Sequence, residues 1–306
     1  MVGIRLSAIP LGARYMVLSA MGFAILAAAV KWVSQKGIPV LEIVAARSII
    51  SLFLSFVVIR SRGISVWGNR KGLLFARGGV GSLALVCVYY AISTLPLAEA
   101  TVLQYLTPMF TAILALIVLH ERLEMATLIC VILSFVGLLC IARPAVIFGG
   151  QVDPLPALSV VVAVMGALGS GVAYVIVRKL SATEDPSVII FYFPLVAMPF
   201  SIGLLGDAFI IPDVAELLGL LVVGIGTQVG QTGLTLALRT EAAGRATAFS
   251  YLQVVFAVAL GWFVFGEMPV VWTWVGAALI VSGALVNVLG IPATVERRGM
   301  VARDRN

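Results

Sequence analysis

Long apolar runs, separated by short polar connections, fill most of the chain. A helix rises about 1.5 Å per residue and a bilayer's hydrocarbon core is about 30 Å thick, so runs of about 20 residues can cross a membrane. Ten such runs occur, at 15–34, 39–59, 73–93, 98–119, 125–141, 156–177, 187–206, 215–238, 244–265 and 270–290. The pattern predicts an all-α polytopic membrane protein with ten transmembrane helices.

The composition supports this fold class. Hydrophobic residues make up 61% of the chain and charged residues 11%, and the mean hydropathy is +1.14. Such a chain is too apolar for a water-soluble domain. Its basic pI, near 9.5, does not indicate nucleic-acid binding, because the basic residues fall mainly in the connections between apolar runs. The surface of the protein is therefore expected to contact the lipid bilayer.

The lysines and arginines near the span ends predict the orientation, because cytoplasmic loops are enriched in both residues. With a cytoplasmic N-terminus, only Lys36 and Arg143 lie outside. The basic residues then placed inside are Arg5, Arg14, Arg60, Arg62, Arg70, Lys71, Arg77, Arg122, Arg178, Lys179, Arg239, Arg245, Arg297, Arg298, Arg303 and Arg305. We therefore expect a protein of the cell inner membrane with both termini in the cytoplasm.

The chain contains an internal duplication. At an offset of 146 positions, Thr101, Tyr105 and Glu121 align with identical residues, which are Thr247, Tyr251 and Glu267. The duplication predicts two five-helix repeats, at 1–150 and 151–306. Because five is an odd number, the second repeat is inverted in the membrane relative to the first, an arrangement typical of secondary transporters.

This arrangement resembles the drug/metabolite transporter superfamily and, within it, the EamA-type transporters. The resemblance rests on positions 100–110 with Pro108, on Glu121 and on Gly137 in the first repeat, and on the corresponding positions 246–256 and 266–267 in the second. It covers almost the whole chain, although Val254 replaces the proline in the second copy. It implies a ten-helix transporter with a central cavity, and its motifs indicate the fold and not the substrate.

Polar residues within the predicted spans are the candidates for substrate binding, because such residues usually face a bundle interior or a water-filled cavity. The alternative is that they only join helices through hydrogen bonds. The candidates are Tyr89, Tyr90, Thr101, Gln104, Tyr105, Tyr174, Gln228, Gln231, Ser250 and Tyr251.

Two cations complete the set of candidates. Lys31 lies about 5 Å and Arg47 about 12 Å inside the predicted outer boundary, where a charge costs on the order of 2.5–3.5 kcal/mol. A structural role is the alternative for each cation. The Lys31 side chain could reach the interface or pair with Glu42, and Arg47 could bind helix-end carbonyls or Glu99. The functional interpretation is that both attract a substrate carboxylate or phosphate, for which a guanidinium offers paired donors.

Other motifs have simpler interpretations. Glu121 and Glu267 each precede a helix, so we expect them to stabilise helix starts in the hairpins between the fourth and fifth helices of each repeat. His120 is expected in a loop. The spacing Gly226-x3-Gly230 predicts close packing of two helices.

Together these features predict a secondary transporter that moves a small amphipathic, amino-acid-like or carboxylate-bearing metabolite by alternating access. Enzymatic function is not expected, because no nucleophile with a base and no set of metal ligands is apparent, and no cofactor or ATP-binding motif is predicted. In four-helix relatives within the superfamily that this chain resembles, proton-driven export of cationic drugs depends on a glutamate in the first helix. The first helix here has no acid, so the resemblance implies no such export. A cationic-drug exporter and a non-transporting scaffold or sensor are the alternatives, and the sequence leaves a homodimer open.

Overall fold

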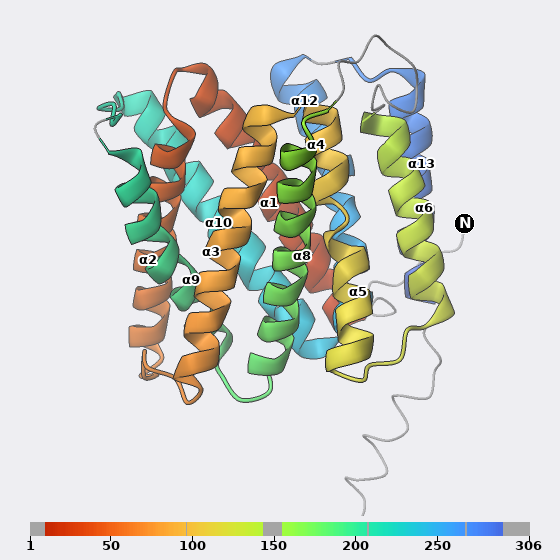
Figure 1. Cartoon of the computed structure of the whole chain (residues 1–306), viewed down its shortest axis with the longest axis horizontal. Helices are drawn as coiled ribbons and strands as arrows, with labels where there is room; N and C mark the ends of the chain where they lie inside the picture. Colours follow the sequence, from red (N-terminus) through yellow and green to blue (C-terminus); the bar gives the residue numbers. More distant parts are fainter. Residues whose placement is uncertain (1–9, 96, 143–154, 207, 267, 290–306) are drawn as a thin grey trace, which may run out of the picture.

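The computed structural model describes residues 10–95, 97–142, 155–206, 208–266 and 268–289. Within these ranges the chain is helical apart from its turns, and ten segments are long and apolar enough to cross a membrane (Figure 1). The first repeat contains α1 (Leu11–Gln35), α2 (Val40–Ser61), α3 (Lys71–Thr94), α4 (Leu97–Gln104), α5 (Thr107–Val118) and α6 (Met125–Ala142). The second contains α8 (Ala157–Leu180), α9 (Pro186–Leu205), α10 (Val214–Thr240), α11 (Ala243–Ala248), the 3-10 turn η2 (Phe249–Tyr251), α12 (Leu252–Phe265) and α13 (Val271–Leu289). The predicted fold class is confirmed.

The fourth span of each repeat is interrupted, whereas the sequence predicted one continuous helix over 98–119 and another over 244–265. In the first repeat, the helix breaks between α4 and α5, just before Pro108. A proline ring clashes with the carbonyl four residues earlier, which is that of Gln104. The hydroxyl of Thr107 donates to this carbonyl at 2.7 Å and so satisfies the broken end. In the second repeat, which lacks the proline, the 3-10 turn η2 joins α11 to α12.

Helices of the two repeats pack mainly against each other. α1 packs against α10 and α12, and its counterpart α8 packs against α3 and α5. Likewise α2 pairs with α9, and α6 pairs with α13 at one side of the molecule (Figure 1). Exchanging the repeats leaves this set of pairs unchanged. The two inverted repeats are therefore related by an approximate two-fold axis, and helices of each repeat pack between helices of the other.

Small residues allow the closest of these contacts. A Cβ added to Gly226 of α10 would lie 3.0 Å from the carbonyl oxygen of Gly22 in α1, and one added to Gly22 would lie 2.7 Å from the amide nitrogen of Gly230. The two helix backbones therefore touch, which confirms the packing predicted from the glycine spacing.

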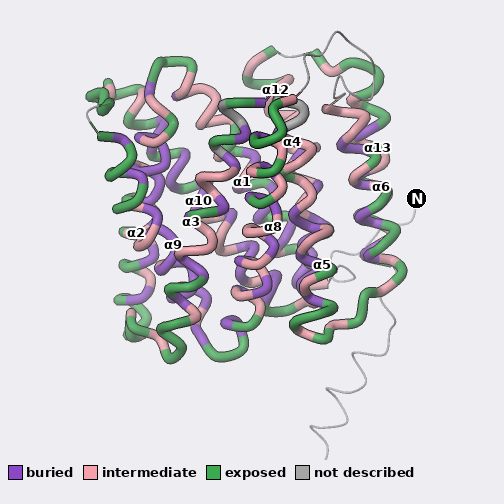
Figure 2. Tube along the Cα trace, viewed as in Figure 1, coloured by how far each residue is buried: buried purple, intermediate pink, exposed green. Residues whose placement is uncertain are grey.

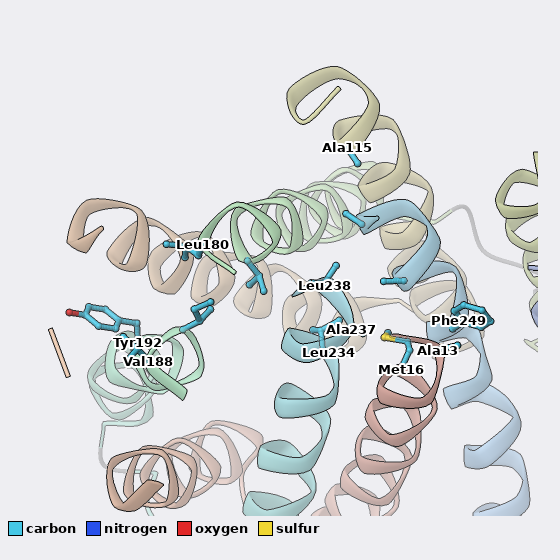
Figure 3. Close-up of a cluster of buried hydrophobic side chains, with 14 of the residues drawn as sticks. Ala13, Met16, Ala115, Leu180, Val188, Tyr192, Leu234, Ala237, Leu238 and Phe249 are labelled. Carbon is cyan, nitrogen blue, oxygen red and sulfur yellow. The ribbon is translucent and has the colours of Figure 1, made fainter. Parts of the chain in front are cut away.

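The largest apolar core lies at one end of the bundle, which we call the basic end. This is the end at which α1 begins and α2 finishes, with Arg60, Arg70 and Arg178 near it. The core joins α1, α8, α9, α10 and α11, and Figure 3 draws most of its buried side chains. Buried positions also follow the inner faces of these helices (Figure 2). The bundle is thus densely packed at the basic end.

Candidate functional site

Two buried arginines from the first repeat lie against one aromatic ring of the second. The guanidinium carbon of Arg47 in α2 is 5.7 Å from the ring centroid of Phe193 in α9, and that of Arg77 in α3 is 4.6 Å away. Arg47 is 8% exposed and Arg77 is 3% exposed. At about 1.5 Å per residue, the Cα of Arg47 lies about 10 Å and that of Arg77 about 9 Å from the start of its helix, and the two helices start at opposite ends of the bundle. The pair therefore lies deep in the bundle.

Arg77 corrects the sequence analysis, which placed this residue with the basic residues at the cytoplasmic boundary. Its Nη2 donates to Oε1 of Gln231 at 3.2 Å, whereas its Nε is buried with no hydrogen-bond partner. Gly81, one turn further along α3, leaves room for the guanidinium. A Cβ at Gly81 would lie 2.5 Å from Nη1 of Arg77 and 3.0 Å from the Phe193 ring.

Three tyrosines extend this polar region toward the interrupted helices. Tyr174 of α8 lies close enough to Arg77 and to Tyr105 to interact with both electrostatically. The hydroxyl of Tyr251 donates to the carbonyl oxygen of Tyr105 at 2.8 Å, and the two rings stack with centroids 5.6 Å apart. Tyr105 and Tyr251 are equivalent positions of the two repeats, and each lies at the break in its fourth span. Arg47, Arg77, Tyr174, Tyr105 and Tyr251 thus form a row of polar side chains, which we call the central polar chain. It runs from α2 to the α11–α12 junction.

The remaining candidates lie in varied surroundings. Gln228 of α10 accepts hydrogen bonds from Ser51 at 2.7 Å and from Ser55 at 3.3 Å, so it joins α10 to α2. Thr101 and Ser250 are half-buried, and Gln104 and Tyr90 are exposed. The side chain of Tyr89 lies outside the described part of the structure. Of the predicted residues, the structure brings together Arg47, Tyr105, Tyr174, Gln231 and Tyr251.

Lys31 lies in a different place. Its ammonium group is 4.8 Å from the ring centroid of Phe265, and it lines a cavity of about 190 Å³ between α1 and α12. Glu42, the expected partner of Lys31, accepts a hydrogen bond from the backbone N–H of Ile210 at 3.0 Å. Arg47 and Lys31, which were predicted to act together, therefore lie at different rings. Arg47 shares the Phe193 ring with Arg77, whereas Lys31 lies at Phe265.

Glu121 connects the two repeats at the basic end. Its Oε1 is 2.7 Å from Nε of Arg178 in α8, and its Oε2 accepts from the backbone N–H of Ala243 at 2.7 Å. Ala243 is the first residue of α11, so the carboxylate binds a helix start, where the helix dipole is positive. We expected such a role, but at the helix that follows Glu121 in sequence. His120 lies in the turn with φ 53°, as expected for a loop residue, and Glu267 lies outside the described residues.

Arg245 forms a second network beside this one. Its Nη1 is 3.4 Å from Oε2 of Glu124, its Nε is 3.9 Å from Oε2 of Glu241, and its Nη2 donates to the carbonyl of Asn287 at 3.1 Å. These acids and arginine line a cavity of about 180 Å³. Burial raises the pKa of Glu241 above 4.5, and the Glu124 carboxylate adds to this effect, while Arg245 and Arg178 oppose it.

The site shows no arrangement typical of a metal centre. Among the described residues, no three His, Cys, Asp or Glu side chains lie together in a way that could hold a metal ion. What the central polar chain offers is cationic and hydrogen-bonding groups beside aromatic rings. Such a set can bind an organic molecule that has an anionic part and an apolar part.

Comparison with known proteins identifies relatives of the chain. The model of the EamA-like transporter family matches residues 10–143 and 157–289. The pseudopaline exporter CntI of Pseudomonas aeruginosa is 32% identical over 270 residues, which cover 88% of this chain and 93% of the exporter. Solute carrier family 35 member G1 of Mus musculus is 30% identical, and the match covers 90% of this chain and 78% of that protein. A solved crystal structure of a protein that is 19% identical superposes with a TM-score of 0.78 over 97% of this chain, which shows the shared fold.

Proposed function

Since the chain belongs to the EamA-like transporter family and is a multi-pass membrane transporter, we propose that it exports a small, carboxylate-bearing organic metabolite by alternating access. It does so as a secondary transporter, without ATP. We place it in the cell inner membrane with the basic end facing the cytoplasm, because basic residues gather at cytoplasmic ends of membrane proteins.

One observation carries the proposal. The fourth spans of both repeats are interrupted at equivalent tyrosines, and these tyrosines meet each other in the bundle. Interrupted helices at corresponding positions of two inverted repeats are typical of substrate sites in secondary transporters, because the break frees backbone groups to line a site. Tyr105, Tyr251 and the nearby Tyr174 would therefore form one side of the site.

The packing of the repeats supports alternating access. The helix pairs are unchanged when the repeats are exchanged, so each repeat could adopt the conformation of the other. The dense core and the Glu121–Arg178 ion pair lie at the basic end. This arrangement suits a state in which the cytoplasmic side is closed.

The charge at the site supports an anionic substrate group. Arg47 and Arg77 are buried on Phe193, and among the described residues neither forms an ion pair. A cationic drug would be repelled there, whereas a carboxylate would be attracted. The tyrosines and Phe193 would contact an apolar or aromatic part of the same molecule. Export is the proposed direction because CntI, at 32% identity, is an exporter.

The proposal can be tested without knowing the substrate. Proteoliposomes would be loaded with a bacterial metabolite extract from which nucleotides have been removed, incubated in buffer without nucleotide, and compared by mass spectrometry with liposomes that hold an Arg47→Ala variant. We expect one or more carboxylate-bearing metabolites to leave the wild-type vesicles and to remain in the variant vesicles. Transport that requires ATP, or loss of amines alone, would overturn the proposal.

A further inference from the structure

We propose that Arg47 and Arg77 together form a site for a dianion, so that the transported molecule carries two carboxylates or groups of equal charge. The inference rests on the proposed transport function and specifies its substrate class. Arg47 binds one anionic group and Arg77 the other, with the carbon skeleton of the molecule beside the ring of Phe193.

The charge balance of the bundle interior favours two anionic groups over one. Both guanidinium groups carry a full charge, because arginine is not deprotonated in proteins. Each charge that is removed from water and left unpaired is costly, and the two like charges also repel each other. A monoanion would compensate one of them, whereas a dianion compensates both.

The buried acids of the described region are occupied elsewhere. The Glu42 carboxylate accepts from the backbone N–H of Ile210 at 3.0 Å. Glu184 accepts from the backbone N–H groups of Asn69 at 2.9 Å and of Arg70 at 2.6 Å. Neither acid forms an ion pair with the arginines. Among the described residues no acid pairs with either arginine, so the compensating charge is left there for a ligand to supply.

The geometry also provides donors for a ligand. Nε of Arg77 is buried and has no partner, although the residue is only 3% exposed. Among the described residues, Gln231 holds Nη2 of this guanidinium, and the Nε edge can donate to a carboxylate. The two guanidinium carbons lie 5.7 Å and 4.6 Å from one ring centroid, so their separation cannot exceed the sum of these distances. That is within reach of two carboxylates separated by a few carbon atoms.

A purely structural role for the pair makes a different prediction. If the arginines served only to hold α2, α3 and α9 together, the charge of a ligand would not matter, and Gln at either position would lower stability with or without ligand. In the dianion site, each arginine forms an ion pair only when the ligand is bound. The decisive comparison is between two ligands of the same shape that differ by one charge.

The experiment uses the full chain in lipid nanodiscs and measures its unfolding midpoint. The probes are malonate, succinate, glutarate and adipate, each compared with its monoamide at matched ionic strength. The proteins are the wild type, Arg47→Gln, Arg77→Gln, Arg77→Lys and the control Arg239→Gln, which removes an exposed charge at the end of α10. A ligand that binds only the folded state raises the midpoint according to its concentration and its Kd.

We expect at least one dicarboxylate to bind the wild type and the control about tenfold or more tightly than its monoamide. In Arg47→Gln and Arg77→Gln, the dicarboxylate and the monoamide should bind equally weakly, and Arg77→Lys should restore part of the difference. Equal binding of every dicarboxylate and its monoamide to the wild type would overturn the inference. So would an undiminished preference for a dicarboxylate in Arg77→Gln.

Transport measured on the same proteins separates this inference from the proposed function. If wild-type liposomes bind a dicarboxylate with the expected dependence on both arginines but never move any metabolite, the transport proposal fails and the site stands. If Arg77→Gln exports the same metabolites as the wild type at the same rate, the two-arginine site fails and the transport proposal stands.

Discussion

Substitution of Glu121 by Gln should open the basic end of the bundle. Glu121 belongs to the first repeat, whereas its partners Arg178 and Ala243 belong to the second, so its two 2.7 Å contacts must break if the repeats separate at this end. A hydrogen bond to a charged group contributes about 1.5–3 kcal/mol. The side chains of Glu121 and Arg178 are 17% and 28% exposed, so solvent screening reduces the gain. Gln keeps one accepting oxygen but loses the charge and the second acceptor, so we assign about 2 kcal/mol to the weakened contacts, which changes the opening equilibrium by a factor of about 30.

The labelling rate of a buried cysteine measures this opening. Ala115 is 2% exposed and lines the cavity at the basic end, and Ala100 is 3% exposed near the other end of the same span. Each is replaced by cysteine in a background without the native thiols, and maleimide labelling is followed in nanodiscs. Glu121→Gln should accelerate labelling at position 115 by up to about 30-fold and should not accelerate labelling at position 100.

Glu124→Gln provides the matched control. Glu124 has a 3.4 Å contact with Arg245 and a side chain that is 41% exposed, so its loss should cost under about 1 kcal/mol. Equal labelling at position 115 in the Glu121 and Glu124 variants would refute the reasoning. Acceleration at both reporter positions, with a lower unfolding midpoint, would mean that Glu121 stabilises the whole fold and not one conformation.

Three further predictions follow from the site. Arg47→Ala should abolish transport and Arg47→Lys should keep a minor fraction, with both proteins inserted and folded; normal transport by Arg47→Ala in proteoliposomes would contradict the anionic-group interpretation. Tyr251→Phe removes the hydroxyl that binds the Tyr105 carbonyl and should accelerate labelling at position 115, whereas Tyr105→Phe should not; equal effects would contradict this. Because burial raises the pKa of Glu241, the folded protein binds this proton more tightly than the unfolded chain. The stability of the wild type relative to Glu241→Gln should therefore fall as the pH rises from 4.5 toward the raised pKa, and a difference in unfolding midpoint that does not change with pH would exclude the effect.

The ten spans and the duplication could be predicted from sequence because both depend on local composition and on residue identity at a fixed offset. The breaks in the fourth spans were harder to predict. Pro108 gives a local reason for the first break, through its clash with the Gln104 carbonyl. The second repeat has Val254 at the aligned position, so its 3-10 turn at η2 depends on packing and has no comparable signal in the sequence.

Arg77 shows why the site could be predicted only in part. Its Cα lies about 9 Å from the start of α3, a depth from which an arginine in a membrane helix can also reach the interface. Its inward direction depends on the space at Gly81 and on Phe193 and Gln231, which come from two other helices. The bond from Ala243 to Glu121 joins residues 122 positions apart and was unpredictable for the same reason.

Tyr105 and Tyr251 form a central contact between equivalent positions that the two-fold relation cannot make twice. The helix pairs are unchanged when the repeats are exchanged, but here Tyr251 donates and Tyr105 accepts. The reverse bond, from the Tyr105 hydroxyl to the Tyr251 carbonyl, would require the repeats to exchange conformations. In a transporter with inverted repeats, such an exchange converts one facing state into the other. The direction of this bond would therefore report which side of the transporter is closed, and the dense core at the basic end agrees with closure there.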